Sequence, residues 1–153
     1  MVFIYLHISV MFLAVALSVG LELVLQRVAA TESVPAIRTV FAAARPIQKA
    51  IPMAYGIGFL LGLVAAIVAS FNLLAPWLLI SYVLFVVSSV LGGRVAGGWA
   101  EKVQQGAEAN QGDVPSAELK ALLHDQRAAQ GMIANLVVVA LIIAMMVFKP
   151  FGV

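Results

Sequence analysis

The chain has 153 residues, of which 63% are hydrophobic and 10% are charged, and its mean hydropathy is +1.08. An average soluble domain is about 45–50% apolar and about 25% charged, so a water-soluble single domain is excluded. The net charge is only +2 and cysteine is absent, which argues against a nucleic-acid partner and excludes disulfide bonds and thiolate metal sites. We therefore expect an all-α integral membrane protein surrounded by a lipid bilayer.

The sequence predicts four transmembrane helices, because four mostly apolar runs approach the roughly 20 residues that cross a bilayer. No basic residue precedes the first run, which is long for a signal peptide, so we expect it to be retained. Pro76 and Trp77 predict a tight hairpin between the second and third spans. The expected fold is a single four-helix bundle over residues 1–153, with spans at about 2–25, 51–74, 75–95 and 131–148.

The first long connection is predicted to contain a short amphipathic helix. Pro35 suits a first helical turn, and apolar residues then recur at helical spacing. We expect this helix to lie in the lipid headgroup layer and to end at Arg45-Pro46, where the chain turns into the second span. The apolar positions are Ile37, Val40, Phe41 and Ala44.

The third connection is predicted to begin with a mobile segment and to continue as a second short helix. Residues 104–112 are polar or small and show no periodicity. Pro115 and Ser116 suit the start of a helix, which we expect to lead into the last span. Its apolar face would carry Leu119, Leu122 and Leu123.

The distribution of lysine and arginine predicts the orientation in the membrane. Eight of the nine basic residues lie in the first and third connections, and Lys149 alone lies on the other side. Because short loops rich in these residues stay in the cytoplasm, we expect both connections to be cytoplasmic and both termini to lie outside a bacterial inner membrane. The eight residues are Arg27, Arg38, Arg45, Lys49, Arg94, Lys102, Lys120 and Arg127.

Small residues mark the expected helix contacts, since helices in lipid associate through close packing of small side chains. The second span carries four of them at successive steps of four, on one face. We expect this face to pack within the bundle, with self-association or contact with a larger membrane complex as the alternatives. The four residues are Gly58, Gly62, Ala66 and Ser70, and a similar group ends the third span at Ser88, Ser89, Gly92, Gly93, Gly97 and Gly98.

Ionisable residues inside a membrane are costly and mark candidate sites. His7 lies about one and a half turns inside the outer face and can act as a proton relay, a ligand or a neutral hydrogen-bonding group. Lys149 leaves the fourth span at a similar depth, so His7 and Lys149 are the candidate cofactor-binding residues. Glu22 and Arg94 approach the cytoplasmic surface and are expected to form a structural ion pair, with Arg27 as the alternative partner of Glu22. No catalytic residue can be assigned.

Haem is the first cofactor to consider for a small helical bundle, because two histidines on neighbouring helices commonly hold it. The chain has only His7 and His124, which the predicted topology places on opposite sides of the membrane. Haem would therefore need His7 with another ligand type, or a second subunit. Copper(I), which prefers thioether ligands, could use His7, Met11, Met145 and Met146. No zinc-ligand spacing, phosphate-binding loop or nucleophile elbow is present.

Three segments carry a resemblance to known families. They are Tyr5-Leu6-His7-Ile8 in the first span, Arg38-Thr39-Val40-Phe41 in the first connection, and Met145-Met146-Val147-Phe148-Lys149-Pro150 at the end of the last span. The chain resembles a bacterial family of predicted four-span membrane proteins of unknown function. More distantly it is similar to the CopD copper-resistance family and the HemJ protoporphyrinogen oxidase family, which also place a histidine early in the first span. HemJ proteins end on Lys-Pro-Phe, as residues 149–151 do here.

Two alternative functions are consistent with the sequence, which does not decide whether the protein is an enzyme. The first is binding of a porphyrin such as haem, a metal or a quinone on the outer side in a redox setting, at His7 and Lys149. The second is a non-catalytic accessory subunit that packs on a larger membrane complex. A small transporter is disfavoured, because the sequence shows no repeat and no paired charges within the spans.

Overall fold

The computed structural model describes residues 1–150, and within them the regular structure is entirely helical. Four helical stretches are long and apolar enough to cross a membrane, so the chain is an all-α four-helix membrane bundle. The elements are α1 (Val2–Ala29), α2 (Val34–Val68), α3 (Pro76–Val90), the π-helix η1 (Leu91–Gly97), α4 (Gly98–Ala109), α5 (Ala117–Leu123) and α6 (Gln126–Phe148).

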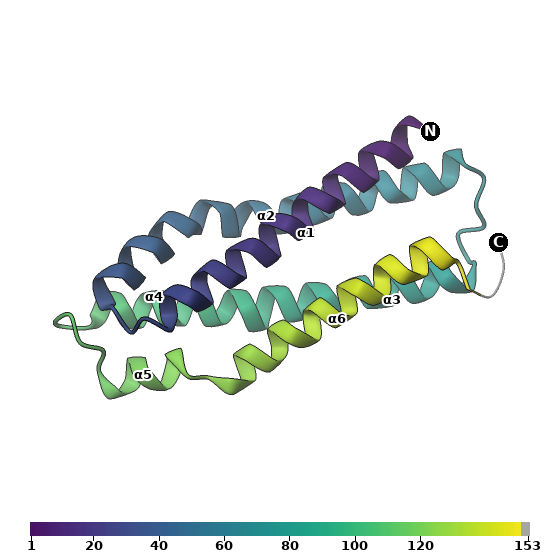
Figure 1. Cartoon of the computed structure of the whole chain (residues 1–153). Coiled ribbons are helices and arrows are strands. Elements are labelled where there is room, and N and C mark those ends of the chain that lie inside the picture. The colour runs from purple at the N-terminus through teal and green to yellow at the C-terminus, as the bar shows by residue number, and fades with distance from the viewer. Residues whose placement is uncertain (151–153) are drawn as a thin grey trace.

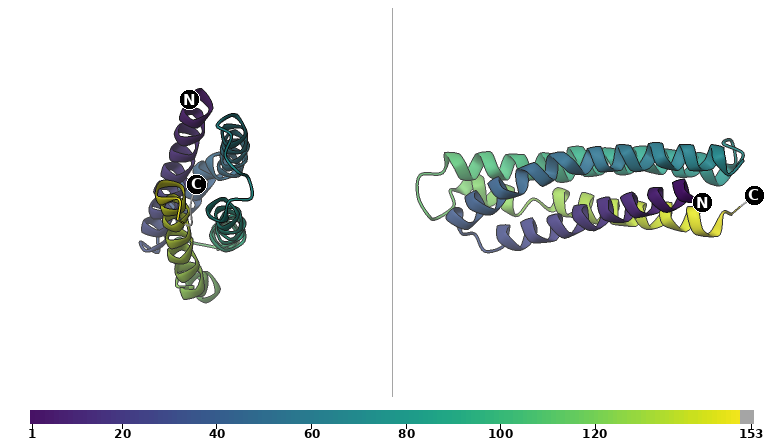
Figure 2. Two further views of the ribbon diagram at one scale, coloured as in Figure 1. Left: turned by 90° about the vertical axis from the view of Figure 1, so that its right-hand side faces the viewer. Right: turned by 90° about the horizontal axis from the view of Figure 1, so that it is seen from above.

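The bundle is built from two helix pairs. Helix α1 packs along α2, and α6 packs along α3 and η1 (Figure 1). The pairs meet mainly where α2 contacts α4. Figure 2 shows the two pairs running alongside each other for most of the length of the bundle. The start of α1 and the end of α6 lie at the same end, as an even number of spans requires (Figure 1).

Helix α2 is one continuous helix, so the prediction that the chain ends a helix at Arg45-Pro46 is wrong. Both Pro46 and Pro52 lie inside it, and the helix bends along its length (Figure 1). A proline removes one backbone hydrogen bond and favours a kink, but contacts on both sides of it can hold the two halves of a helix together. Here Ile37 and Phe41, before Pro46, share a core cluster with residues of α4, and glycines after Pro52 lie against α1.

The apolar face of residues 34–44 is confirmed, and it packs inside the protein. Ile37 is fully buried and Phe41 is 1% exposed, in the same core cluster as Trp99 and Val103 of α4. The rings of Phe41 and Trp99 lie 5.9 Å apart between centroids. The apolar face of an amphipathic helix can be buried against lipid or against another helix. Here it is buried against α4.

Helix α4 corrects the expectation that residues 104–112 are mobile, because the helix continues to Ala109. Ala107 is fully buried against the apolar face of α2. Arg38 donates hydrogen bonds to the backbone oxygens of Ala107, at 2.7 Å, and of Asn110. A cation at the last carbonyls stabilises the end of a helix. The polar sequence hid this helix because its stability comes from contacts with α2.

Helix α5 begins where the sequence predicts, after Pro115. The hydroxyl of Ser116 accepts a hydrogen bond from the backbone N–H of Leu119 at 3.2 Å, which caps the helix, and Leu119 is 1% exposed. The helix ends at Leu123, and Asp125 caps α6 separately. Glu32, in the turn between α1 and α2, lies 3.6 Å from Lys120 and 3.5 Å from His124, so ionic contacts connect this end of both pairs.

The small-residue face of α2 is confirmed as a packing surface for α1. A Cβ atom on Gly58 would lie 2.5 Å from the sulfur of Met11, and a Cβ atom on Gly62 would lie 2.7 Å from Cε1 of His7. Ala66 continues the face and is 5% exposed, whereas Ser70 lies beyond the helix and is exposed. The absent side chains thus allow the two helices to approach closely.

Candidate functional site

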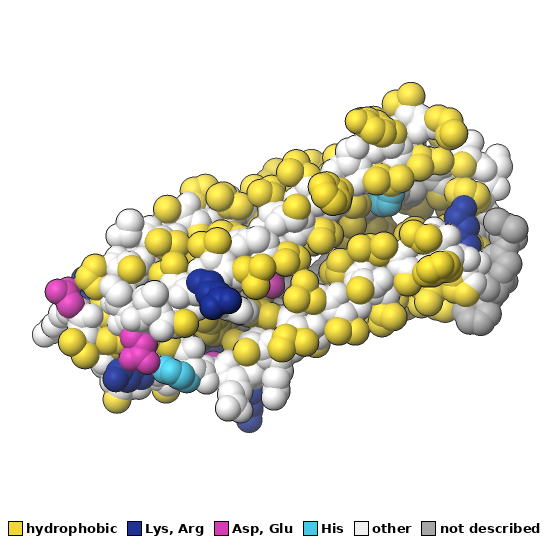
Figure 3. Space-filling view, in the orientation of Figure 1, with side chains coloured by type: hydrophobic (Ala, Val, Ile, Leu, Met, Phe, Trp, Pro, Cys, Tyr) yellow, Lys and Arg dark blue, Asp and Glu magenta, His cyan; other side chains and the backbone are white. Residues whose placement is uncertain are grey.

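A cavity of about 530 Å³ lies between the two helix pairs, toward the end that holds the start of α1. We call it the His7 cavity. Both candidate cofactor-binding residues, His7 and Lys149, line it. Its volume falls within the range of about 300–1,000 Å³ that is usual for small-molecule sites. Figure 3 shows the molecule hollowed between the pairs at this end, with apolar side chains around the opening.

One nitrogen of His7 is held by the backbone of α2. Its Nδ1 lies 2.7 Å from the carbonyl oxygen of Gly58. A carbonyl only accepts hydrogen bonds, so Nδ1 carries the proton and Nε2 has a free lone pair in the neutral ring. Histidines that ligate metals commonly hold their other nitrogen in this way. The ring of His7 lies directly against Gly62. The contact between α1 and the small-residue face of α2 therefore also fixes the orientation of His7.

Lys149 is held over aromatic rings at the edge of the cavity. It has left-handed backbone angles, φ 43° and ψ 54°, and its N–H bonds to the carbonyl of Met145 at 3.1 Å, which ends α6. Its Nζ lies 4.5 Å from the centroid of the Phe71 ring and 5.6 Å from that of Trp77. These cation–π contacts keep the charge beside the cavity. Phe151, which completes the Lys-Pro-Phe ending, lies outside the described residues.

Two buried hydrogen-bond donors of α3 have no partner among the described residues. They are Nε1 of Trp77 and the hydroxyl of Tyr82, and both residues line the His7 cavity. Trp77 is only 3% exposed. Leaving a buried polar group unpaired costs about 1–3 kcal/mol, so each of these two donors carries an energetic cost in the structure as it stands. From the sequence, Trp77 is predicted only as part of the hairpin between the second and third spans, and neither donor is predicted.

The sequence does contain a pattern that predicts the face of α3 along the His7 cavity. Polar and aromatic residues recur along the otherwise apolar α3 at steps of three and four, which places them on one face. The hydroxyl of one of them, Ser81, is occupied by a bond to the carbonyl of Trp77 at 2.7 Å. Phe85 stacks on Phe59 of α2 with centroids 4.8 Å apart. The members of this face are Trp77, Ser81, Tyr82, Phe85 and Ser88.

The cavity also contains thioether groups. Met11 of α1 and Met146 of α6 line it together with His7, whereas Met145 is not among the lining residues. The described residues contain no group of three or more histidine, cysteine or acidic side chains placed to hold a metal ion. A metal in this cavity would therefore depend on one imidazole, on sulfur and on whatever ligand the metal brings with it.

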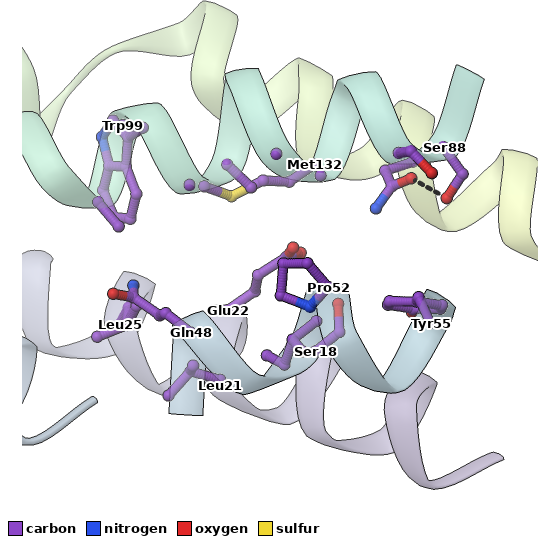
Figure 4. Close-up of a pocket in the computed structure, with 18 of the residues that line it drawn as sticks. Ser18, Leu21, Glu22, Leu25, Gln48, Pro52, Tyr55, Ser88, Trp99 and Met132 are labelled. Carbon is purple, nitrogen blue, oxygen red and sulfur yellow. Dashed lines mark hydrogen bonds between the residues drawn. The ribbon is translucent and has the colours of Figure 1, made fainter. Parts of the chain in front are cut away.

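A second cavity of about 380 Å³, the Glu22 cavity, lies nearer to α4 (Figure 4). Glu22 extends from α1 into the space between the two pairs, opposite Met132 and Trp99 (Figure 4). Ser88 donates a hydrogen bond to Asn135 at 2.7 Å across this wall. Gly92, Gly93 and Gly97 were expected to mark contacts between helices. Instead they line the Glu22 cavity, where the absence of side chains leaves space.

The predicted ion pair between Glu22 and Arg94 is not formed. Both salt bridges among the described residues use Glu32, and Arg27 does not pair with Glu22 either. Arg94 is exposed and is not among the lining residues of the Glu22 cavity, although its neighbours in η1 are. The reason is geometric, because the wide turn of η1 presents its glycines to the cavity and places Arg94 on the outer surface.

Comparison with known proteins gives no relative. No family model, curated protein or solved structure matches this chain. The two cavities and the side chains that line them are therefore the features that bear on function.

Proposed function

We propose that this chain binds a planar, mostly apolar redox cofactor of the porphyrin class in the His7 cavity. The observation that carries the proposal is the state of His7, whose Nδ1 donates to the backbone and whose Nε2 is left for a ligand. A metalloporphyrin would supply the redox chemistry, and His7 would be its axial ligand. Met11 and Met146 supply the other ligand type that a single histidine requires.

The remaining lining residues match the other parts of such a molecule. Rings of Phe59, Tyr82 and Phe85 offer flat apolar contacts. Lys149 carries the charge that favours a carboxylate at the edge of the cavity. A quinone, with carbonyl acceptors and an apolar tail, would use the charge of Lys149 and the aromatic rings without a metal.

Titration of the purified, detergent-solubilised protein with ferric haem tests the proposal. We expect saturable binding with a Soret band shifted from that of free haem. A protein that binds no haem but quenches its tryptophan fluorescence with a quinone would move the proposal to the quinone class. A protein that binds neither and co-purifies with one large membrane complex would favour the accessory-subunit function.

Replacing Lys149 with glutamine should weaken haem binding by about tenfold, which corresponds to about 1.4 kcal/mol. The change removes the charge that would pair with a carboxylate of the ligand and keeps a similar side-chain length. The measurement is the haem dissociation constant, with Lys102→Gln as the matched control, because Lys102 is exposed on α4. Equal affinity of both variants and the wild type would remove Lys149 from the site.

We also propose that the protein lies in a bacterial inner membrane with both termini outside and with relatives among the CopD and HemJ families. The charge distribution supports this orientation, because the basic connections lie at the end of the bundle opposite both termini. Single cysteines can be introduced cleanly, since the chain has none.

An impermeant thiol reagent applied to intact spheroplasts should label a cysteine added after Val153. It should not label Gln111→Cys, in the exposed connection between α4 and α5, until the membrane is permeabilised. The reverse labelling pattern would invert the proposed orientation and place the His7 cavity on the cytoplasmic side.

A further inference from the structure

We propose that the two cavities together form a proton path along the bundle, and that Glu22 is the group through which protons must pass. This inference goes beyond the proposed function and does not require a bound cofactor. It starts from an unpaired carboxyl group inside a membrane helix, which is costly and therefore marks a function.

Glu22 is the only charged side chain among the residues that line its cavity. The groups that face it from the other elements are neutral and polar, and Tyr55 of α2 is the only other one that titrates. Within residues 1–150 no cation forms a salt bridge with the Glu22 carboxyl, so it can gain and lose a proton in place. The remaining polar groups are Ser18, Gln48, Ser88, Ser89 and Asn135.

The Glu22 cavity has the size and the lining that water requires. A volume of about 380 Å³ leaves room for several water molecules, each of which takes about 30 Å³ in the liquid. Polar side chains from α1, α2, α3 and α6 supply the two to four hydrogen bonds that an ordered water needs. A chain of such waters passes protons between side chains that cannot touch directly.

The two cavities adjoin each other. Tyr55, Phe85 and Ser88 line both of them. A hydroxyl group can both accept and donate a hydrogen bond, which is the property a relay needs, and Tyr55 and Ser88 each supply one hydroxyl. At the far end the Glu22 cavity reaches Trp99, whose Nε1 bonds to the carbonyl of Leu122 in α5 at 2.9 Å. The residues that line the two cavities thus extend from Trp99 of α4 to Lys149.

The transfer is balanced at each step. Water at the α4 end gives a proton to the carboxylate of Glu22, and the neutral carboxyl then gives its proton to water on the side of Tyr55. The hydroxyls of Tyr55 and Ser88 pass it to water in the His7 cavity, which releases it at the end of the bundle that holds Lys149. The carboxylate of Glu22 is restored for the next proton, and no electron moves.

Proton flux into vesicles tests the path. The chain without cofactor is reconstituted into vesicles of phosphatidylethanolamine and phosphatidylglycerol with an internal pH-sensitive dye, and a potassium gradient with valinomycin drives protons inward. We expect faster acidification than in empty vesicles. Glu22→Gln should lower the protein-dependent flux by about 100-fold, within the range that a positioned proton-transfer group contributes. Glu22→Asp keeps a carboxyl and should retain most of the flux.

Two further variants separate the path from a general leak. Glu101→Gln, on the exposed first turn of α4, should conduct like the wild type. Gly93→Leu should fill the Glu22 cavity and stop the flux while Glu22 stays in place, since a Cβ atom at Gly93 meets nothing within 4 Å. Equal flux in Glu22→Gln and the wild type, or a wild type no faster than empty vesicles, would overturn the proposal. Haem binding by Glu22→Gln should be unchanged. The haem titration therefore tests the cofactor proposal independently of the proton path.

Discussion

His7→Ala is expected to bind ferric haem at least about 100-fold more weakly than the wild-type chain. Loss of a partner behind a metal-binding histidine typically costs 10–100-fold in affinity, and loss of the ligand itself costs more. The change removes Nε2, which keeps its lone pair because Nδ1 donates to the carbonyl of Gly58. The measurement is the Soret absorbance during haem titration in detergent, combined with circular dichroism to confirm that the helices are intact.

His124→Ala is the matched control for this experiment. His124 is the other histidine of the chain, and it is exposed at the far end, 3.5 Å from Glu32. We expect this variant to bind haem like the wild type. Imidazole added to His7→Ala should restore the Soret band, because it supplies the missing nitrogen to the space that the substitution creates. Undiminished binding by His7→Ala would contradict the assignment of His7 as the axial ligand.

The sequence predicts the transmembrane architecture well because the bilayer limits what an apolar run of about 20 residues can form. It predicts the connections less well because contacts with other helices decide them. Residues 104–109 are polar and show no periodicity, yet they form a helix through Val103 and Ala107, which pack on α2. Pro46 stays inside a helix for the same reason, since tertiary contacts hold both halves of α2.

The candidate site shows the same limit. His7 and Lys149 stand out in the sequence because ionisable residues are rare in apolar helices, and the structure places both at one cavity. The unpaired donors of Trp77 and Tyr82 could not be identified, because only packing reveals that a polar atom lacks a partner. Glu22 was expected to pair with Arg94 because both lie at a similar depth in the membrane. Depth does not say toward which side of its helix a residue points, and the π-helix η1 places Arg94 on the outer surface.

Gly62→Leu is expected to lower the free energy of unfolding by about 1–3 kcal/mol, the usual effect of overpacking a well-packed contact. A Cβ atom at this position would lie 2.7 Å from both Cε1 and Nδ1 of His7, so the ring or the whole of α1 must move. Movement of the ring would also break the bond to Gly58. Thermal unfolding in detergent, followed by circular dichroism, measures the loss of stability, and haem titration of the same variant measures the loss of the site.

Gly20→Leu is the matched control, because it makes the same chemical change at a glycine of α1 whose Cβ atom would meet nothing within 4 Å. It should be neutral or more stable by up to about 1 kcal/mol, since leucine favours a helix more than glycine does. The difference between the two variants isolates the contact between Gly62 and His7 from helix propensity. If both variants unfold at the same temperature, α1 does not pack on the small-residue face of α2, and the orientation of His7 must have another cause.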